Sequence, residues 1–96
     1  MSLAPKIVLQ APLADPSALQ PFVEDCLRDG VELIAVVGTG CEALEEAIDW
    51  IVIGDGSDGT RFLTTSAHPN ESLQNAVSFA DAWISRRDGG VQVVAL

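Results

Sequence analysis

The sequence predicts a single three-layer α/β domain over residues 1–96, with a mostly parallel sheet of about five strands and one antiparallel hairpin. Residues 31–37 and 49–53 are apolar runs without the polar alternation of a half-exposed strand. Such runs are typical of strands covered on both faces, as in a parallel sheet between helices. A glycine turn at 38–40 and a helical period over 41–48 join the two runs into a β-α-β unit. The full predicted order is β-α-β-α-β-β-α-β.

The composition is that of one small folded domain. Of the 96 residues, 48% are hydrophobic and 20% are charged, which suits one modest core. No apolar run approaches the roughly 20 residues of a membrane span. The first residues lack the features of a signal peptide, and residues 1–4 are expected to lie outside the fold or to remain from cloning. Cys26 and Cys41 fit no zinc, redox or disulfide pattern, so a cytoplasmic location is expected.

The net charge limits the possible partners. Fourteen acidic residues face five basic ones, giving a formal charge of −9. Such a surface repels phosphate backbones and anionic lipids, so nucleic acid and membranes are excluded as partners. Acidity by itself keeps a small protein soluble, but it also attracts a basic protein partner. The open edges of a sheet additionally allow a homo-oligomer.

The first strand and helix follow from simple patterns. Residues 6–10 form a short apolar strand between Pro5 and Pro12. The next apolar residues recur at positions i, i+3, i+4, i+7 and i+8, and these are Leu19, Phe22, Val23, Cys26 and Leu27. This spacing predicts a helix over about 18–29, with Pro21 in its first turn and Gly30 just past its end. Cys26 is expected to be a core residue.

The middle of the chain is predicted to contain a short helix and a hairpin. Thr39 and Glu42 have the spacing of a capping box. The helix is expected to end near residue 48, because 49–53 has the aromatic and β-branched content of a strand, with Trp50 packed in the core. The turn-rich segment 54–59 is too short for a crossover helix, so residues 61–66 are expected to pair antiparallel with 49–53; the alternative is that 49–66 is one helix-plus-loop region.

The last part of the chain predicts a helix and a terminal strand. Pro69 suits the first helical position, with His68 or Asn70 as the cap. Apolar residues then recur at helical spacing as far as Trp83 and Ile84, and residues 86–90 supply two arginines and a glycine pair that end the helix. Residues 91–96 form a final apolar strand.

The leading candidate site is the turn at residues 38–41, formed by Gly38, Thr39, Gly40 and Cys41. Ligands of open α/β sheets bind at the carboxyl ends of strands, and a glycine turn before a helix offers backbone N–H groups to an anion. The glycines and Ala43 formally fit the G-x-G-x-x-A pattern of dinucleotide sites. The short helix and its three glutamates oppose this interpretation, and a tight turn without a ligand is the competing one.

Two other chemistries are considered and given less weight. Cys41 lies near a helix N-terminus, which favours a thiolate nucleophile, and His68 is the only histidine that could act as its base. The predicted hairpin places these two residues at opposite edges of the sheet. Residues 55–59 have the acidic and glycine content of a calcium loop but not its ligand spacing, so no metal and no cofactor are predicted.

The sequence leads to three functional hypotheses. The first is a small acidic cytoplasmic protein-interaction module without catalysis, acting through self-association or a basic protein partner. The second is a module that binds a small anionic ligand or nucleotide at residues 38–41. The third is a thiol enzyme that uses Cys41.

Overall fold

The computed structural model describes residues 3–96, which form a four-stranded sheet and three α-helices. The strands are β1 (Lys6–Ala11), β2 (Leu33–Gly38), β3 (Thr64–His68) and β4 (Val91–Ala95). The helices are α1 (Leu19–Asp29), α2 (Cys41–Ile53) and α3 (Leu73–Ala82), with a short 3₁₀ turn, η1 (Pro16–Ala18), before α1. All strand pairs are parallel, and their order across the sheet is β3-β2-β1-β4.

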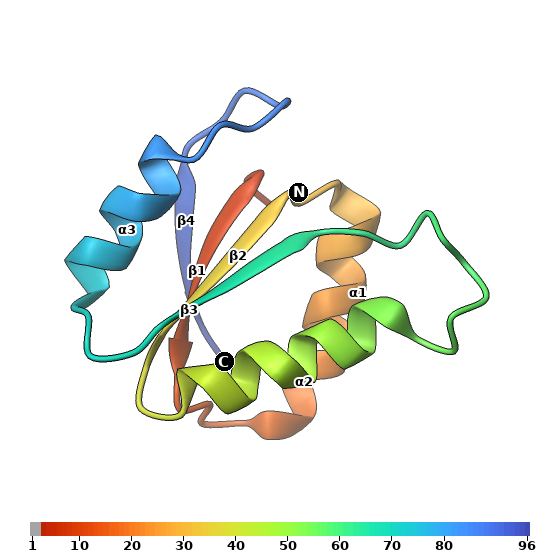
Figure 1. Ribbon diagram of the computed structural model, residues 1–96, viewed down its shortest axis with the longest axis horizontal. Helices are drawn as coiled ribbons and strands as arrows, with labels where there is room; N and C mark the ends of the chain where they lie inside the picture. The colour runs from red at the N-terminus through yellow and green to blue at the C-terminus, as the bar shows by residue number, and fades with distance from the viewer. Residues whose placement is uncertain (1–2) are drawn as a thin grey trace.

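The helices lie on both faces of the sheet, as a three-layer arrangement requires. Helices α1 and α2 cover one face and α3 covers the other (Figure 1). The chain moves from β1 to β2 to β3 in one direction and then returns past β2 and β1 to reach β4. Because crossover connections keep one hand, this reversal of direction transfers α3 to the opposite face.

The core is built on the two central strands. β1 and β2 pair in register from Lys6↔Leu33 to Ala11↔Gly38, and their side chains alternate between two buried clusters. On the α1/α2 face the cluster contains Ile7, Leu9, Ile34 and Val36 together with apolar residues of both helices. On the α3 face, Val8, Ala35 and Val37 pack against the small residues Ala76 and Ala80. Continuous apolar runs in the central strands are thus confirmed as the signature of a sheet buried on both faces.

The predicted hairpin at residues 49–66 is wrong, because residues 49–53 belong to α2. Ile48 and Val52 lie one helical turn apart and are buried with the α1 side chains. Asp49 accepts a hydrogen bond of 2.6 Å from Thr65 Oγ1, which ties the helix to β3. Helix packing therefore overrides the strand propensity of this stretch, and the sheet has four parallel strands instead of five with a hairpin.

The ends of α2 and α3 also differ from the predicted ones. The N-cap of α2 is Gly40, with no side-chain cap bond, so the predicted capping box at Thr39 does not form. The N-cap of α3 is Ser72, whose hydroxyl accepts from Asn75 N at 3.1 Å. His68 is instead the last residue of β3.

Helix α3 stops at Ala82, before the predicted end. The buried Lys6 Nζ donates to the carbonyl oxygens of Asp81 and Trp83 at 3.0 Å each, which places a positive charge at the helix C-terminus. The arginines that were expected in the last turn lie in the following loop. There the Glu32 carboxylate accepts the backbone N–H groups of Arg86 and Arg87 at 2.9–3.0 Å.

The N-terminal segment contacts the fold from residue 3 onward. Leu3 N donates to Asp29 Oδ2 at 3.0 Å, and Ala4 N donates to the side-chain oxygen of Gln92 at 3.1 Å. The first two residues of the segment predicted to lie outside the fold fall outside the described residues. Among residues 3–96, no helix has both the length and the apolar character that crossing a membrane demands.

Gly38 is required by close packing between the ends of β1 and β2. A Cβ atom at this position would clash with the carbonyl oxygen of Ala11, and φ is +107°. Gly40 also has a positive φ, +78°, but a Cβ atom there would meet nothing within 4 Å. The two glycines of the turn therefore have different roles: Gly38 allows β1 and β2 to approach, and Gly40 provides a left-handed cap for α2.

We expect Gly40→Ala to lower the free energy of unfolding by about 1–2 kcal/mol, the ordinary cost of a left-handed alanine. Gly38→Ala should lower it by at least about 3 kcal/mol, because a backbone clash adds to the strain. Urea denaturation followed by circular dichroism measures both losses. Equal losses of stability in the two variants would show that β1 can move away from a side chain at position 38 at no cost, and would contradict the proposed role of Gly38.

We expect the Glu32 carboxylate to make the free energy of unfolding depend on pH. Hydrogen bonds from the Arg86 and Arg87 backbones lower the pKa of Glu32, so its contribution to stability is complete at neutral pH and is lost as pH falls through the lowered pKa. Glu32→Gln should be less stable than the wild type at pH 7, and the two should converge in acid. Unfolding temperatures measured from neutral pH to about pH 2 test this, and parallel curves would contradict it.

Candidate functional site

The predicted site residues lie at the carboxyl edge of the sheet, in a hollow of about 440 Å³. Residues 38–42 line one side and residues 69–71 line the other. The hairpin prediction had separated these two loops. They meet because β3 runs parallel to β2, so that both strands end at the same edge.

The charges in this hollow oppose an anionic ligand. Glu42 and Glu71 contribute to its lining, and the lining residues, all within 3–96, include no lysine or arginine. The crevice between β1 and β4, where ligands of open α/β sheets commonly bind, is crossed by the chain itself. There Ala14 N and Asp15 N donate to Leu96 O at 2.6 and 3.3 Å. A phosphate or nucleotide site at residues 38–41 stays a prediction, and the carboxylates of Glu42 and Glu71 disfavour it.

Cys41 and His68 are not arranged as a nucleophile and its base. Cys41 is 1% exposed and packs in the cluster on the α1/α2 face. His68 is paired with Val37, whose side chain points to the α3 face, and its ring centroid lies 4.5 Å from that of Phe79 in α3. The sheet therefore separates the two side chains. Burial raises the pKa of the other thiol, Cys26, to about 12, which favours its protonated form.

A hydrogen-bonded array that the sequence analysis missed surrounds His68. Its Nε2 lies 2.9 Å from Ser66 Oγ, and its Nδ1 lies 3.0 Å from Glu71 Oε2. This is the order of nucleophile, base and acid in serine hydrolases. The available signal was the spacing S-x-H-x-x-E, which puts the serine and histidine on one face of a strand and the glutamate in the turn after it.

The array lacks the surroundings of a catalytic centre. Neither Ser66 nor His68 lines the hollow at this edge, and the Glu71 side chain is 41% exposed. The array instead provides partners for both ring nitrogens of a buried histidine, as buried polar groups require. We therefore assign it a structural role.

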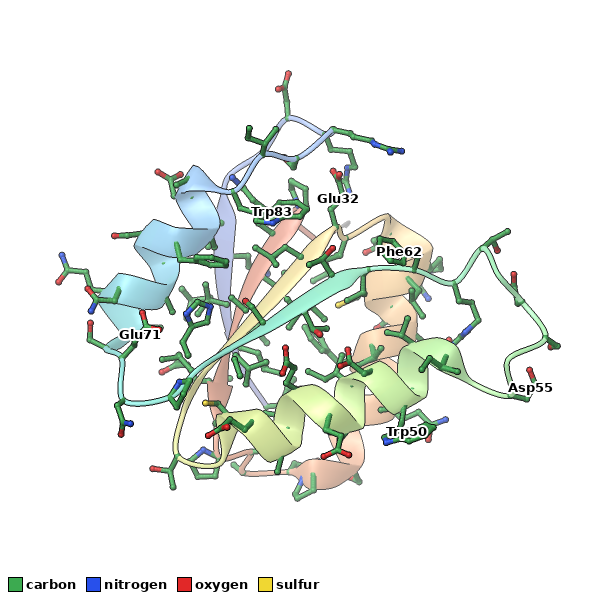
Figure 2. The ribbon with its side chains drawn as sticks, viewed as in Figure 1. Glu32, Trp50, Asp55, Phe62, Glu71 and Trp83 are labelled. Atoms are coloured by element: carbon green, nitrogen blue, oxygen red, sulfur yellow. The ribbon has the colours of Figure 1, made fainter. Side chains whose placement is uncertain are left out.

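The exposed face of α2 carries a different feature, a stripe that is acidic at one end and apolar at the other. Glu42, Glu46, Trp50 and Ile53 recur at helical spacing and all face solvent. Trp50 is 65% exposed and Ile53 is 52% exposed. Trp50 points away from the sheet (Figure 2), so its predicted place in a strand core is wrong for the same reason as the hairpin.

An acidic hollow of about 460 Å³ lies beside Trp50, lined in part by Glu24, Asp55, Asp58 and Arg61. The Arg61 guanidinium donates to both carboxylate oxygens of Glu24 at 2.9 Å and to the carbonyl oxygens of Ile51 and Val52 at 2.8 and 3.0 Å. It holds the loop to the end of α2 and lowers the pKa of Glu24. Three carboxylates against one engaged arginine leave the hollow with a negative charge.

The two aspartates of this hollow are held in place by their own loop. Asp55 Oδ1 accepts from Ser57 N and Oγ at 2.9 and 2.6 Å. Asp58 Oδ1 accepts in the same way from Thr60 N and Oγ1, at 2.9 and 2.5 Å. These hydrogen bonds lower the pKa of both carboxyls, so both stay ionised into mildly acidic pH.

We call Trp50, Ile53, Asp55 and Asp58 the Trp50 surface. It combines an exposed indole, an exposed aliphatic side chain and two fixed negative charges. Such a set is suited to a cationic, partly apolar partner. Across residues 3–96, no three histidine, cysteine or acidic side chains are grouped so as to hold a metal ion.

We expect Arg61→Lys to loosen the loop over residues 54–63, because lysine keeps the charge but cannot donate to the carboxylate and carbonyl oxygens together. Trypsin should then cut after residue 61 several-fold faster than in the wild type. Arg28→Lys is the matched control, since the Arg28 side chain is 70% exposed and only pairs with neighbouring aspartates. Mass spectrometry of the digests reports the rate, and an unchanged rate in Arg61→Lys would refute the proposed anchoring.

Comparison with known proteins identifies a family but no activity. Residues 5–93 match a family described as a domain of unknown function, DUF7684. Neither the curated proteins nor the solved structures contain a match to the chain. Because the matched region covers nearly all of the sequence, the chain belongs to the DUF7684 family.

Proposed function

We propose that this domain is a non-catalytic protein-interaction module that binds a basic segment of a partner protein at the Trp50 surface. The observation that carries the proposal is Trp50, 65% exposed beside a negatively charged hollow. Tryptophan is enriched at the energetic centres of interfaces. A lysine or arginine of the partner would lie on the indole face with its charge toward Asp55 and Asp58.

The magnitudes point to a weak contact with short ligands. A cation over an exposed indole contributes about 0.5–1 kcal/mol, and more when water is excluded. Exposed ion pairs with the two aspartates add only about 0.2–1 kcal/mol each. These contacts add up to at most about 3 kcal/mol, so a short peptide should bind with a dissociation constant of several millimolar at best, and a folded basic protein more tightly. The net charge of −9 adds long-range attraction that speeds association at low salt.

Other features support this class over the two alternatives. Cys41 and His68 lie on opposite faces of the sheet, which counts against a thiol enzyme. Glu42 and Glu71 in the hollow at residues 38–41 count against an anion-binding module. Both cysteines are free and buried, in keeping with a reducing compartment such as the cytoplasm.

We expect a short blocked peptide of lysines interrupted by leucines to change the fluorescence of Trp50 in a saturable way. The Trp83→Phe variant leaves Trp50 as the single indole, so the signal reports this surface alone. Binding should weaken as salt is raised, because the contact depends on charge. The double substitution Asp55→Asn and Asp58→Asn should weaken it several-fold.

Two controls give this experiment its specificity. The same peptide with glutamate in place of lysine should not bind, and Asp25→Asn removes a carboxylate of α1 that lies outside the Trp50 surface. Asp25→Asn should leave the affinity close to that of the wild type. The proposal fails if the peptide does not bind at low salt, or if the Asp55/Asp58 variant binds as well as the Asp25 variant.

A further inference from the structure

A second surface, separate from the Trp50 surface, lies at the amino ends of β2 and β3. It is a groove of about 550 Å³ that we call the amino-edge groove. Its apolar lining consists of Leu27, Val31, Phe62, Leu63, Trp83 and Ile84. Phe62 is 76% exposed and Ile84 is 91% exposed, the two highest values among the large hydrophobic residues of the segment 3–96.

The exposure of these two side chains follows from the path of the chain. Leu63 turns into the core just before β3 begins, which leaves its neighbour Phe62 on the outside. Trp83 caps the end of α3 and is half-buried, and the next residue, Ile84, projects into solvent. Phe62 and Trp83 lie along the same edge of the molecule, with Glu32 between them (Figure 2). Two projecting apolar side chains therefore share one face with a hollow.

The charge of this face differs from the rest of the acidic chain. Two arginines and one glutamate line the groove. The Glu32 carboxylate is occupied by the backbone N–H groups of Arg86 and Arg87, and the Arg87 side chain donates to the carbonyl oxygens of Asp29 and Leu3. The Arg86 side chain is exposed and makes no hydrogen bond or ion pair within residues 3–96. The face thus has a small positive charge on a chain of net charge −9.

We propose that a second copy of the chain docks in the amino-edge groove, about a two-fold axis. A two-fold interface requires one patch to complement itself, and this face offers both projecting side chains and the hollow to receive them. Most of the acidic surface would bring carboxylates of the two copies together. Contact through this face avoids that repulsion.

The groove lining contains none of the residues that define the Trp50 surface. The inference does not depend on the proposed function. A dimer could form without any basic partner, and a basic partner could bind a monomer. The two experiments can therefore fail separately.

Sedimentation equilibrium over low-micromolar to millimolar protein concentrations tests the proposal. The average mass should rise from that of one chain to that of two, and the dissociation constant should be weakened at least about tenfold by Ile84→Asp. In a Trp50→Phe background, Trp83 fluorescence should shift over the same concentration range. Ile84 is almost fully exposed, so circular dichroism of the variant should match the wild type, and Ile84→Ser replaces it if the charge disturbs folding.

Control variants distinguish this face from the other exposed apolar positions. Val93→Asp places a charge on the edge strand β4, and Trp50→Ser alters the α2 stripe. Both should dimerise as the wild type does. A chain that stays monomeric at millimolar concentration overturns the proposal. So does a dimer that survives both Ile84→Asp and Phe62→Asp, or one that is lost through Val93→Asp, which would place the contact at the sheet edge.

Discussion

The parallel pairing of β3 with β2 is the interaction on which the other features depend. It requires residues 41–53 to form one crossover helix, and the hydrogen bond from Thr65 to Asp49 ties that helix to the strand. The same pairing brings the loops after β2 and β3 to one edge while it keeps Cys41 and His68 on opposite faces. It also turns Trp50 outward, because Ile48 and Val52 occupy the buried side of the helix. This one strand pairing thus keeps Cys41 apart from His68 and leaves Trp50 exposed on α2.

Local patterns predicted those elements whose burial is set by the nearby sequence. The strands at 6–10 and 91–96, the strand at 31–37 and the helix at about 18–29 match β1, β4, β2 and α1 to within two residues. Residues 49–53 were assigned wrongly because a short apolar run such as residues 50–53 fits a strand and a helix equally well. Only the contacts with α1 and Thr65 decide between them, and those contacts are distant in sequence. The turn at residues 38–41 was located correctly. The position of the Glu71 carboxylate opposite this turn could not be predicted, because it depends on the direction of β3.

Much of the acidity serves the fold as well as the surface. Asp55 and Asp58 close their own loop, Glu24 receives Arg61, and Glu32 binds the backbone after α3. Each of these hydrogen bonds stabilises the charged carboxylate, which is why the pKa of each group is lowered. The net charge of −9 is therefore a poor guide to the available binding charge. A basic partner can use only those carboxylates whose ionised oxygens remain open to solvent beside an apolar side chain. The Trp50 surface meets that condition.

The two proposed contacts would reinforce each other in one assembly. A two-fold dimer joined at the amino-edge groove would carry two Trp50 surfaces, neither of which contributes residues to the groove lining. A partner with two basic segments could then engage both, and the second contact would form at the high effective concentration set by the first. A cation on a single exposed indole binds weakly, so such bivalency is a physical route by which a domain of 96 residues could reach useful affinity without a deep pocket. The gain would require partner segments spaced to match the two surfaces, which makes dimer geometry a determinant of specificity.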